Sequence, residues 1–279
     1  MTNRRSFLKI AGIGTAASAL PGLLNASAGG AEAGKSKHDI QLGVASYTLR
    51  KFSAEEALDM TLRCGVTRIT FKDMHLPLDS DKETIRKAVE LCKKKGITLY
   101  GAGVVYMKNR EEADRAFEYA KTAGMEMIVG VPNHELLEYV EDKVKQYDVK
   151  LAIHNHGPGD KLYPSAESAY NLIKNLDNRM GLCIDIGHTK RINRDPEQDV
   201  KDFFNRIFDI HIKDVTSASA EGRTCIIGRG VIDFPSFLKT IVKKGYMGTL
   251  ALEYEAEADD PLPGMMESLG FIKGILAML

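Results

Sequence analysis

The sequence lacks an excess of charge of either sign. Its 279 residues include 38 Lys and Arg and 38 Asp and Glu, which gives a formal net charge of +0. A balanced charge provides no long-range attraction to nucleic acid or to an anionic membrane, so neither is expected as a partner. The length fits one large domain or two small ones, and α/β barrels of this size commonly fold as one.

Closely spaced cysteines are also missing. The four cysteines, Cys64, Cys92, Cys183 and Cys225, are widely separated and form neither a C-x-x-C pair nor a zinc-ribbon pattern. We therefore expect free and mostly buried thiols. A disulfide between Cys64 and Cys92, which fall on neighbouring predicted helices, is the alternative left open.

The sequence has no long uninterrupted apolar run near its start. The most apolar stretch there covers residues 10–24 and is broken by Gly12, Gly14 and Pro21. A stretch broken in this way makes a poor membrane-spanning helix, whereas it suits the apolar part of a removable export signal.

The residues around that stretch resemble a twin-arginine export signal. Arg4 and Arg5 open the string R-R-S-F-L-K, and Ala-Ser-Ala at 26–28 matches the pattern of an A-x-A cleavage site. We expect a cleaved signal over 1–28, a polar linker over 29–39 and export by the twin-arginine machinery. In a bacterium with an outer membrane the destination is the periplasm, with no membrane anchor after cleavage. A general secretory signal with a chance arginine pair is the alternative.

Beyond the linker, short apolar runs rich in Ile, Val and Leu recur along the chain. Runs of this length and composition are typical of strands buried on both faces. The eight predicted strands cover residues 41–47, 67–72, 97–101, 126–131, 149–154, 180–185, 207–213 and 248–254.

Segments with helical spacing lie between these runs. Ser53 and Glu56 form a predicted capping box at the first helix, and Ser165 opens a later one. Glycines at 65, 96, 124 and 245 are predicted helix ends. The other helices are expected at 81–95, 109–123, 133–147, 165–176, about 195–205, 234–244 and 262–278.

Strict alternation of eight strands and eight helices predicts a single (β/α)₈ TIM barrel over residues 40–279. A doubly wound open sheet is the competing fold, and it would show a glycine-rich phosphate turn after an early strand. Gly101 and Gly103 follow the third strand without the third glycine of that motif. We also find no second domain and no low-complexity tract.

Histidines gather at one end of the predicted barrel. Of the seven, only His38 lies in the linker, and the other six lie at or just after strand ends, with His134 at the very start of the helix expected at 133–147. Active sites of such barrels lie at the carboxyl ends of the strands, and imidazole is the commonest metal ligand near neutral pH. The six histidines at or just after strand ends are His75, His134, His154, His156, His188 and His211.

Carboxylates occur at equivalent depths. Asp185 ends the sixth strand and Glu253 ends the eighth, so both join His154 and His211 in one quadrant of the barrel. Converging nitrogen and carboxylate donors favour a metal site. Each residue alone could instead be a hydrogen-bonded core group; the set of four is what points to a metal.

Three short stretches then resemble the xylose isomerase-like TIM-barrel superfamily, in particular its sugar phosphate isomerase/epimerase group. These are CIDIGH at 183–188, DIHIKD at 209–214 and LALEYE at 250–255, and the G-x-G-x-x-D-F stretch at 228–234 is also similar. The resemblance covers nearly all of residues 40–279.

The resemblance implies one divalent metal in the barrel mouth. It identifies Asp185, His211 and Glu253 as ligands, with Glu253 also catalytic. It further implies that His188 faces the substrate and that Lys213 takes part in catalysis.

The fifth strand departs from the family pattern. Many relatives carry a glutamate where His154 stands, so we expect His154 to replace it as the fourth ligand, with His156 further out as a catalytic group. Two histidines and two carboxylates favour Mn, Co, Fe, Ni or Zn over Mg. Only Glu253 remains of the two glutamates that move a proton in related epimerases, which leaves His154, His156, His188 or Lys213 as the second base.

The implied activity is a metal-dependent sugar isomerase or epimerase that removes a proton next to a carbonyl. A lyase acting by β-elimination, as in relatives resembling inosose dehydratase or acting on 3-keto-glycosides, is the close alternative. A non-catalytic sugar-binding barrel is the alternative of another class. An endonuclease is disfavoured, because the chain has no basic excess.

Three residues near strand ends are candidate contacts for a carbohydrate, and a fourth lies between two glycines in the loop after the seventh strand: Lys72, His75, Glu255 and, in the loop, Arg229. Lys72 and Arg229 could equally be exposed surface residues. Tyr47 and Tyr106 also lie near strand ends, where aromatic side chains either line the mouth or fill the core. The specific sugar and the formation of a homo-oligomer are left open.

Overall fold

The computed structural model describes residues 40–279, and the expected signal and linker, with Arg4 and Arg5, lie outside them. Within the described residues the eight expected strands form a closed parallel barrel in the order β1-β10-β7-β6-β5-β4-β3-β2. The barrel strands are β1 (Gln41–Ala45), β2 (Arg68–Phe71), β3 (Thr98–Met107), β4 (Met127–Pro132), β5 (Lys150–His154), β6 (Met180–Asp185), β7 (Ile207–Ile212) and β10 (Thr249–Leu252).

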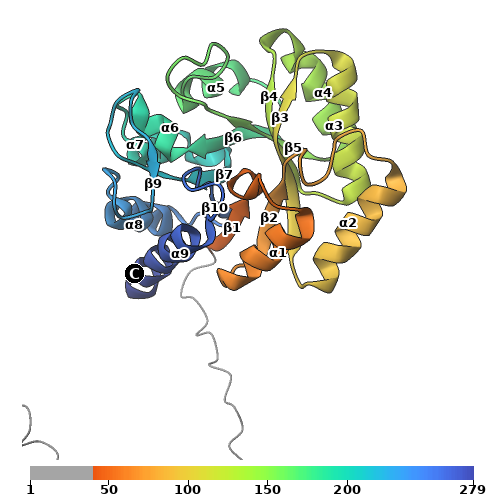
Figure 1. Cartoon of the computed structure of the whole chain (residues 1–279). Helices are drawn as coiled ribbons and strands as arrows, with labels where there is room; N and C mark the ends of the chain where they lie inside the picture. The colour runs from red at the N-terminus through yellow and green to blue at the C-terminus, as the bar shows by residue number, and fades with distance from the viewer. Residues whose placement is uncertain (1–39) are drawn as a thin grey trace, which may run out of the picture. The chain divides into compact units, whose positions relative to one another are not determined.

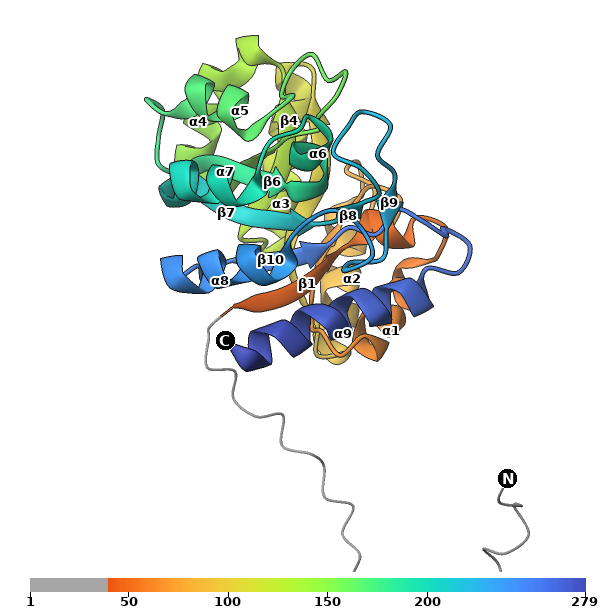
Figure 2. The same cartoon turned by 90° about the vertical axis from the view of Figure 1, so that its left-hand side faces the viewer.

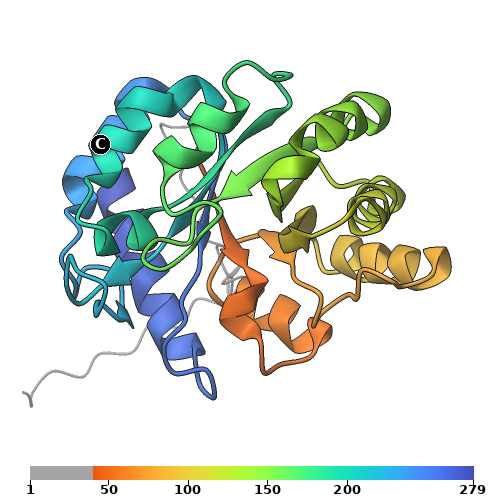
Figure 3. The same cartoon turned by 90° about the horizontal axis from the view of Figure 1, so that it is seen from above.

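Helices surround the strands on the outside (Figure 1, Figure 3). The expected helices are all present. They are α1 (Ala54–Arg63), α2 (Lys82–Lys94), α3 (Arg110–Ala123), α4 (Leu137–Tyr147), α5 (Ala166–Ile173), α7 (Pro196–Phe203), α8 (Phe234–Lys244) and α9 (Leu262–Met278).

The local signals at helix ends are confirmed. Ser53 and Glu56 form a capping box at α1, and Ser165 forms one with Ser168 at α5. Gly124 ends α3 with φ of 67° and Gly245 ends α8 with φ of 70°, a conformation that suits glycine.

Short elements connect these parts. One helix, α6 (Ile186–Arg191), was not expected, and it starts directly after β6 with Asp185 as its N-cap. The remaining pieces are the 3₁₀ turns η1 (Ser46–Leu49), η2 (His134–Leu136) and η3 (Phe204–Arg206), and a small antiparallel pair, β8 (Asp214–Val215) and β9 (Thr224–Cys225).

The two ends of the described chain meet at one side of the barrel. Strand β1 pairs with β10, and α9 lies beside α1 (Figure 2). Lys273 on α9 donates a hydrogen bond of 2.8 Å to the carbonyl of Cys64 at the end of α1. Closure in this way leaves no unpaired barrel edge.

All four cysteines are free; three are buried and Cys225 is partly exposed. The bridge left open between Cys64 and Cys92 is therefore not formed. No helix among residues 40–279 is long and apolar enough to cross a membrane.

Candidate metal centre and pocket

Four buried side chains converge at the carboxyl end of the barrel. The residues are His154 at the end of β5, Asp185 at the end of β6, His211 in β7 and Glu253 just after β10, and their donor atoms lie within 4.8 Å of one another. The strand register explains the convergence, because Asp185 is paired with His211 across β6 and β7. These are the four ligands expected from the sequence.

The separations between donor atoms suit a single ion. His154 Nε2 lies 3.1 Å from His211 Nδ1 and 3.7 Å from Asp185 Oδ2. Glu253 Oε2 lies 3.3 Å from His211 Nδ1 and 4.0 Å from His154 Nε2. A tetrahedral ion with bonds of about 2.1 Å would hold its donors about 3.4 Å apart. Asp185 Oδ2 is buried and accepts no hydrogen bond, and its charge is balanced by the Lys213 ammonium 3.1 Å away, so the oxygen remains available to a cation.

A fifth possible donor, Cys183, also lies near His154 and His211. Burial raises the pKa of the Cys183 thiol to about 12, so the thiol stays protonated at neutral pH and is a poor ligand. The set with two carboxylates is therefore the better metal site.

Lys213 balances the charge of this centre. Its side chain is 2% exposed, and Nζ lies 3.1 Å from Asp185 Oδ2 and 3.0 Å from Glu253 Oε2 and also contacts Glu255. Burial raises the pKa of Asp185, but the Lys213 ammonium more than offsets this and holds it well below its usual range. Burial also raises the pKa of Glu253, and Lys213 again more than offsets this and holds it below its usual range. Both carboxylates are therefore ionised.

Two histidines beside the carboxylates, His154 and His188, are neutral, whereas His211 carries a proton. Burial lowers the pKa of His211, but Cys183 and Glu253 more than offset this and raise it well above its usual range, so a bound metal would have to displace a proton from this ring. Burial lowers the pKa of His154 to about 4, and it lowers the pKa of His188 to about 4 as well. A neutral imidazole has a free lone pair, which a metal ligand requires. The Nε2 atom of His188 lies 4.0 Å from Asp185 Oδ2, and its Nδ1 atom accepts a hydrogen bond of 3.3 Å from Arg191.

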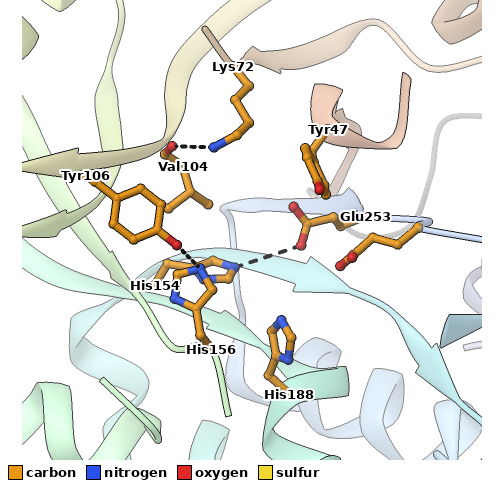
Figure 4. A pocket seen from close by; sticks show the side chains of 9 residues that line it. Tyr47, Lys72, Val104, Tyr106, His154, His156, His188 and Glu253 are labelled. Carbon is orange, nitrogen blue, oxygen red and sulfur yellow. Dashed lines mark hydrogen bonds and ion pairs between the residues drawn. The ribbon is translucent and has the colours of Figure 1, made fainter. Parts of the chain in front are cut away.

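A pocket of ≈ 290 Å³ opens above the four donors (Figure 4). This is near the lower end of the size range of small-molecule sites. Lys72 Nζ donates a hydrogen bond of 2.9 Å to the Val104 carbonyl at its upper edge. The residues that line it are Tyr47, Lys72, Val104, Tyr106, His154, His156, His188, Glu253 and Glu255.

The pocket contains most of the residues expected to act on a substrate. His156, His188, Lys72 and Glu255 line it, whereas Lys213 lies behind Glu253 and reaches it only through the carboxylates. Figure 4 shows Tyr106 and Glu253 on opposite sides of the His154 and His156 rings.

Two expected substrate contacts lie elsewhere, which corrects the sequence-based prediction. Both ring nitrogens of His75 are already engaged, with Ser46 Oγ at 3.0 Å and the Leu49 carbonyl at 3.1 Å, so this buried ring fixes the turn η1. Arg229 instead forms two hydrogen bonds of 2.7 Å with Glu267 on α9.

Sequence reasoning missed one residue that contacts the pocket histidine His156, and it undervalued one residue that lines the pocket. Asp160, in the loop after β5, lies 3.5 Å from His156 Nδ1 through its Oδ2 atom. Tyr106 lines the pocket because β3 continues to Met107, well past the predicted end at residue 101. The sequence signal for Asp160 was only its spacing of four residues from His156.

Comparison with known proteins gives a consistent result. The family described as "Xylose isomerase-like TIM barrel" matches residues 58–275. The rhizopine catabolism protein MocC of Rhizobium meliloti is 28% identical over 144 residues, which are 46% of this chain and 44% of MocC. Inosose dehydratase of Lacticaseibacillus casei is 25% identical over 136 residues, 43% of this chain and 45% of that protein. The chain thus aligns with less than half the length of these two curated relatives.

Solved structures share the fold. A structure of L-ribulose 3-epimerase superposes with a TM-score of 0.71 at 16% identity and covers 86% of this chain and 97% of that chain. At this identity the similarity establishes the barrel architecture alone.

Proposed function

Because the chain belongs to the xylose isomerase-like TIM barrel family, we propose that it is a divalent-metal-dependent enzyme that removes a proton next to a carbonyl of a sugar or keto-sugar. The observation that supports this most strongly is the group of four buried donors within 4.8 Å of one another at the base of the pocket. Proteins similar in sequence or in fold include dehydratases and epimerases.

His154, Asp185, His211 and Glu253 would hold the metal. When bound, the ion would polarise the substrate carbonyl and stabilise the negative charge that forms as the neighbouring carbon loses its proton. Two imidazoles and two carboxylates favour Mn, Co, Fe, Ni or Zn over Mg, which prefers oxygen ligands.

Glu253 is the proposed base for the carbon-bound proton. It lines the pocket, and the ammonium of Lys213, 3.0 Å away, keeps its carboxylate ionised. Lys72 and Glu255 line the same pocket and would bind the hydroxyl groups of a carbohydrate. His188 would contact the substrate from the side of Asp185.

An isomerase or epimerase is the first candidate, because the return of the proton to the substrate needs only the groups already described. A lyase is the second candidate, and two observations favour it. A curated relative is an inosose dehydratase, and the Tyr106 hydroxyl lies beside His156, where it could protonate a departing oxygen.

A hydrogen-exchange experiment tests the proposal. The purified chain would be incubated in D₂O with Mn²⁺, Co²⁺ or Zn²⁺ and a panel of ketoses, aldoses, inososes and 3-keto-glycosides. Deuterium incorporation next to a carbonyl, detected by NMR and abolished in Glu253→Gln, is expected. No incorporation with any metal would support the non-catalytic sugar-binding alternative.

We also propose that the chain is exported through the twin-arginine pathway. The support is the R-R-S-F-L-K string that contains Arg4 and Arg5. Fusion of residues 1–39 to a reporter should direct it to the periplasm, and replacement of both arginines by lysine should block export. Export that persists in that variant would indicate a general secretory signal instead.

A further inference from the structure

Three side chains form a line that ends in the pocket. The Tyr106 hydroxyl lies 3.1 Å from His156 Nε2, and the two rings are stacked with centroids 5.7 Å apart. On the other side of the imidazole, His156 Nδ1 lies 3.5 Å from Asp160 Oδ2. The arrangement is Asp160–His156–Tyr106, with the phenol at the end that lines the pocket. Figure 4 shows the Tyr106 and His156 part of it.

The backbone of the loop after β5 holds Asp160 in place. Its Oδ1 atom accepts hydrogen bonds of 2.7 Å from the N–H groups of both Leu162 and Tyr163. The N–H of His156 donates to the carbonyl of Tyr163 at 3.0 Å. One carboxylate oxygen is thus used by the loop, and the other is directed at the imidazole.

These contacts indicate the direction of the hydrogen bond between Tyr106 and His156. A carboxylate oxygen only accepts, so Asp160 Oδ2 at 3.5 Å favours the tautomer with hydrogen on His156 Nδ1, which has no hydrogen-bond partner of its own. Nε2 then has a lone pair and accepts the hydrogen of the Tyr106 hydroxyl. Tyr106 is 44% exposed, and its oxygen keeps its lone pairs free for a substrate hydroxyl.

We propose that Tyr106 is a catalytic residue that carries the oxygen-bound proton of the substrate, with His156 and Asp160 as the positioning residues behind it. This inference rests on the proposed function, and it assigns the second proton-transfer group that the loss of a family glutamate leaves open. Glu253, on the opposite side of the histidine rings, handles the carbon-bound proton (Figure 4).

The proton movements balance for an isomerisation. The C–H bond next to the carbonyl breaks, its proton goes to Glu253, its electron pair forms a C=C bond, and the π pair of the carbonyl moves onto the carbonyl oxygen to give an enediolate. The neighbouring hydroxyl passes its proton to the oxygen of Tyr106, and the original phenol proton moves to His156 Nε2. On the return path, Tyr106 protonates the former carbonyl oxygen and regains its own proton from His156. Glu253 meanwhile protonates the former carbonyl carbon.

The first test needs no substrate. In the full chain labelled with ¹⁵N-histidine, NMR should show His156 with hydrogen on Nδ1, and the signal can be assigned with His156→Gln. Asp160→Asn keeps an acceptor for the loop but presents an N–H group to His156 Nδ1, so the hydrogen should move to Nε2. Hydrogen on Nε2 in the original chain, or a tautomer unchanged in Asp160→Asn, would overturn the inference.

The second test uses the substrate found by deuterium exchange. Tyr106→Phe should lower kcat for net conversion by about 10²–10⁴-fold, the usual contribution of a proton-transfer group, and leave KM within about threefold. Carbon–hydrogen exchange by Glu253 should fall far less. Tyr147→Phe removes a phenol hydroxyl from α4, outside the pocket, and should leave kcat unchanged.

Different results would contradict the proposed function and the role of Tyr106. No deuterium incorporation by the original chain would contradict the proposed function, while the NMR test of the Asp160–His156–Tyr106 line would still be decisive. Normal conversion by Tyr106→Phe, with Co²⁺ bound as tightly as in the original chain, would contradict the role of Tyr106 alone.

Discussion

The Nε2 atom of His154 lies 3.1 Å from the Nδ1 atom of His211 in the buried base of the pocket. Two imidazole lone pairs do not face each other at this distance unless a proton or a cation lies between them. Oxygens of Asp185 and Glu253 approach the same point. A shared metal ion accounts for all four side chains together, and the following predictions depend on it.

Replacement of His154 by glutamate should change the metal preference. His154→Glu would give a site with three carboxylates and one imidazole, which is closer to the oxygen ligands that Mg²⁺ prefers. We expect the affinity for Mg²⁺ relative to Co²⁺ to rise at least about tenfold, measured by isothermal titration calorimetry.

A matched control is available at another strand-end histidine. His134 Nε2 lies 2.9 Å from the Leu162 carbonyl and is not among the four donors, so His134→Gln should keep the original preference. An unchanged preference in His154→Glu would show that His154 is not a ligand.

Removal of the metal should lower the thermal stability. An ion that binds only the folded chain, present at about 100 times its Kd, stabilises it by about 2.7 kcal/mol. For a domain of this size that corresponds to a rise in Tm of about 5–10 °C. Differential scanning calorimetry with EDTA and then with excess Mn²⁺ or Co²⁺ measures this shift, and equal Tm values in both conditions would argue against a buried site.

Gly187, which packs against the side chain of Lys213, should be essential for the metal centre. A Cβ atom on Gly187 would lie 2.8 Å from Cγ and 2.9 Å from Cδ of Lys213, so Gly187→Ala must displace the lysine from Asp185 and Glu253. We expect a loss of about 1–3 kcal/mol in the free energy of unfolding, together with weaker metal binding.

The control is a helical glycine with open space around it. A Cβ atom on Gly270 in α9 meets nothing within 4 Å, so Gly270→Ala should be neutral or stabilise the chain by up to about 1 kcal/mol. Urea denaturation of both variants makes the comparison. If Gly187→Ala matched Gly270→Ala in stability and in metal affinity, the position of Lys213 would be unimportant for the metal centre.

His75 should matter for stability but not for the metal. His75→Ala removes the two hydrogen bonds that the buried imidazole makes with Ser46 Oγ and the Leu49 carbonyl, and it should cost about 1–3 kcal/mol. Arg229→Ala breaks only an exposed ion pair and should cost less than about 1 kcal/mol. Both variants should keep the bound metal. Loss of metal from His75→Ala would contradict this and would place His75 among the residues that support the metal site.

Much of the fold was predictable, because the two periodicities of strands and helices are local properties of the sequence. The exceptions have local causes. Gly101 and Gly103 suggested the end of the third strand, whereas in the structure they let β3 pass close to β4. A Cβ on Gly103 would lie only 2.5 Å from that of Val129. The helix α6 was missed because Asp185, expected only as a ligand, also caps it through a 2.7 Å bond from the His188 N–H.

The site was predictable to the extent that strand ends determine it. Asp185 and Glu253 were found because parallel strands bring their carboxyl ends together. The position of His75 and Arg229 in the chain did not reveal that each side chain turns towards another partner. Asp160 was missed because its contact with His156 depends on the shape of a loop, which no periodic pattern encodes.

Metal analysis of the purified chain beside its Asp185→Ala variant tests the central claim most directly. Inductively coupled plasma mass spectrometry should find about one equivalent of Mn, Fe, Co, Ni or Zn in the original chain and almost none in the variant, because Asp185 supplies a buried donor oxygen. Circular dichroism would establish that the variant is folded. An original chain that contains no metal, even after it has been incubated with each ion, would contradict the metal centre and the proposed reaction with it.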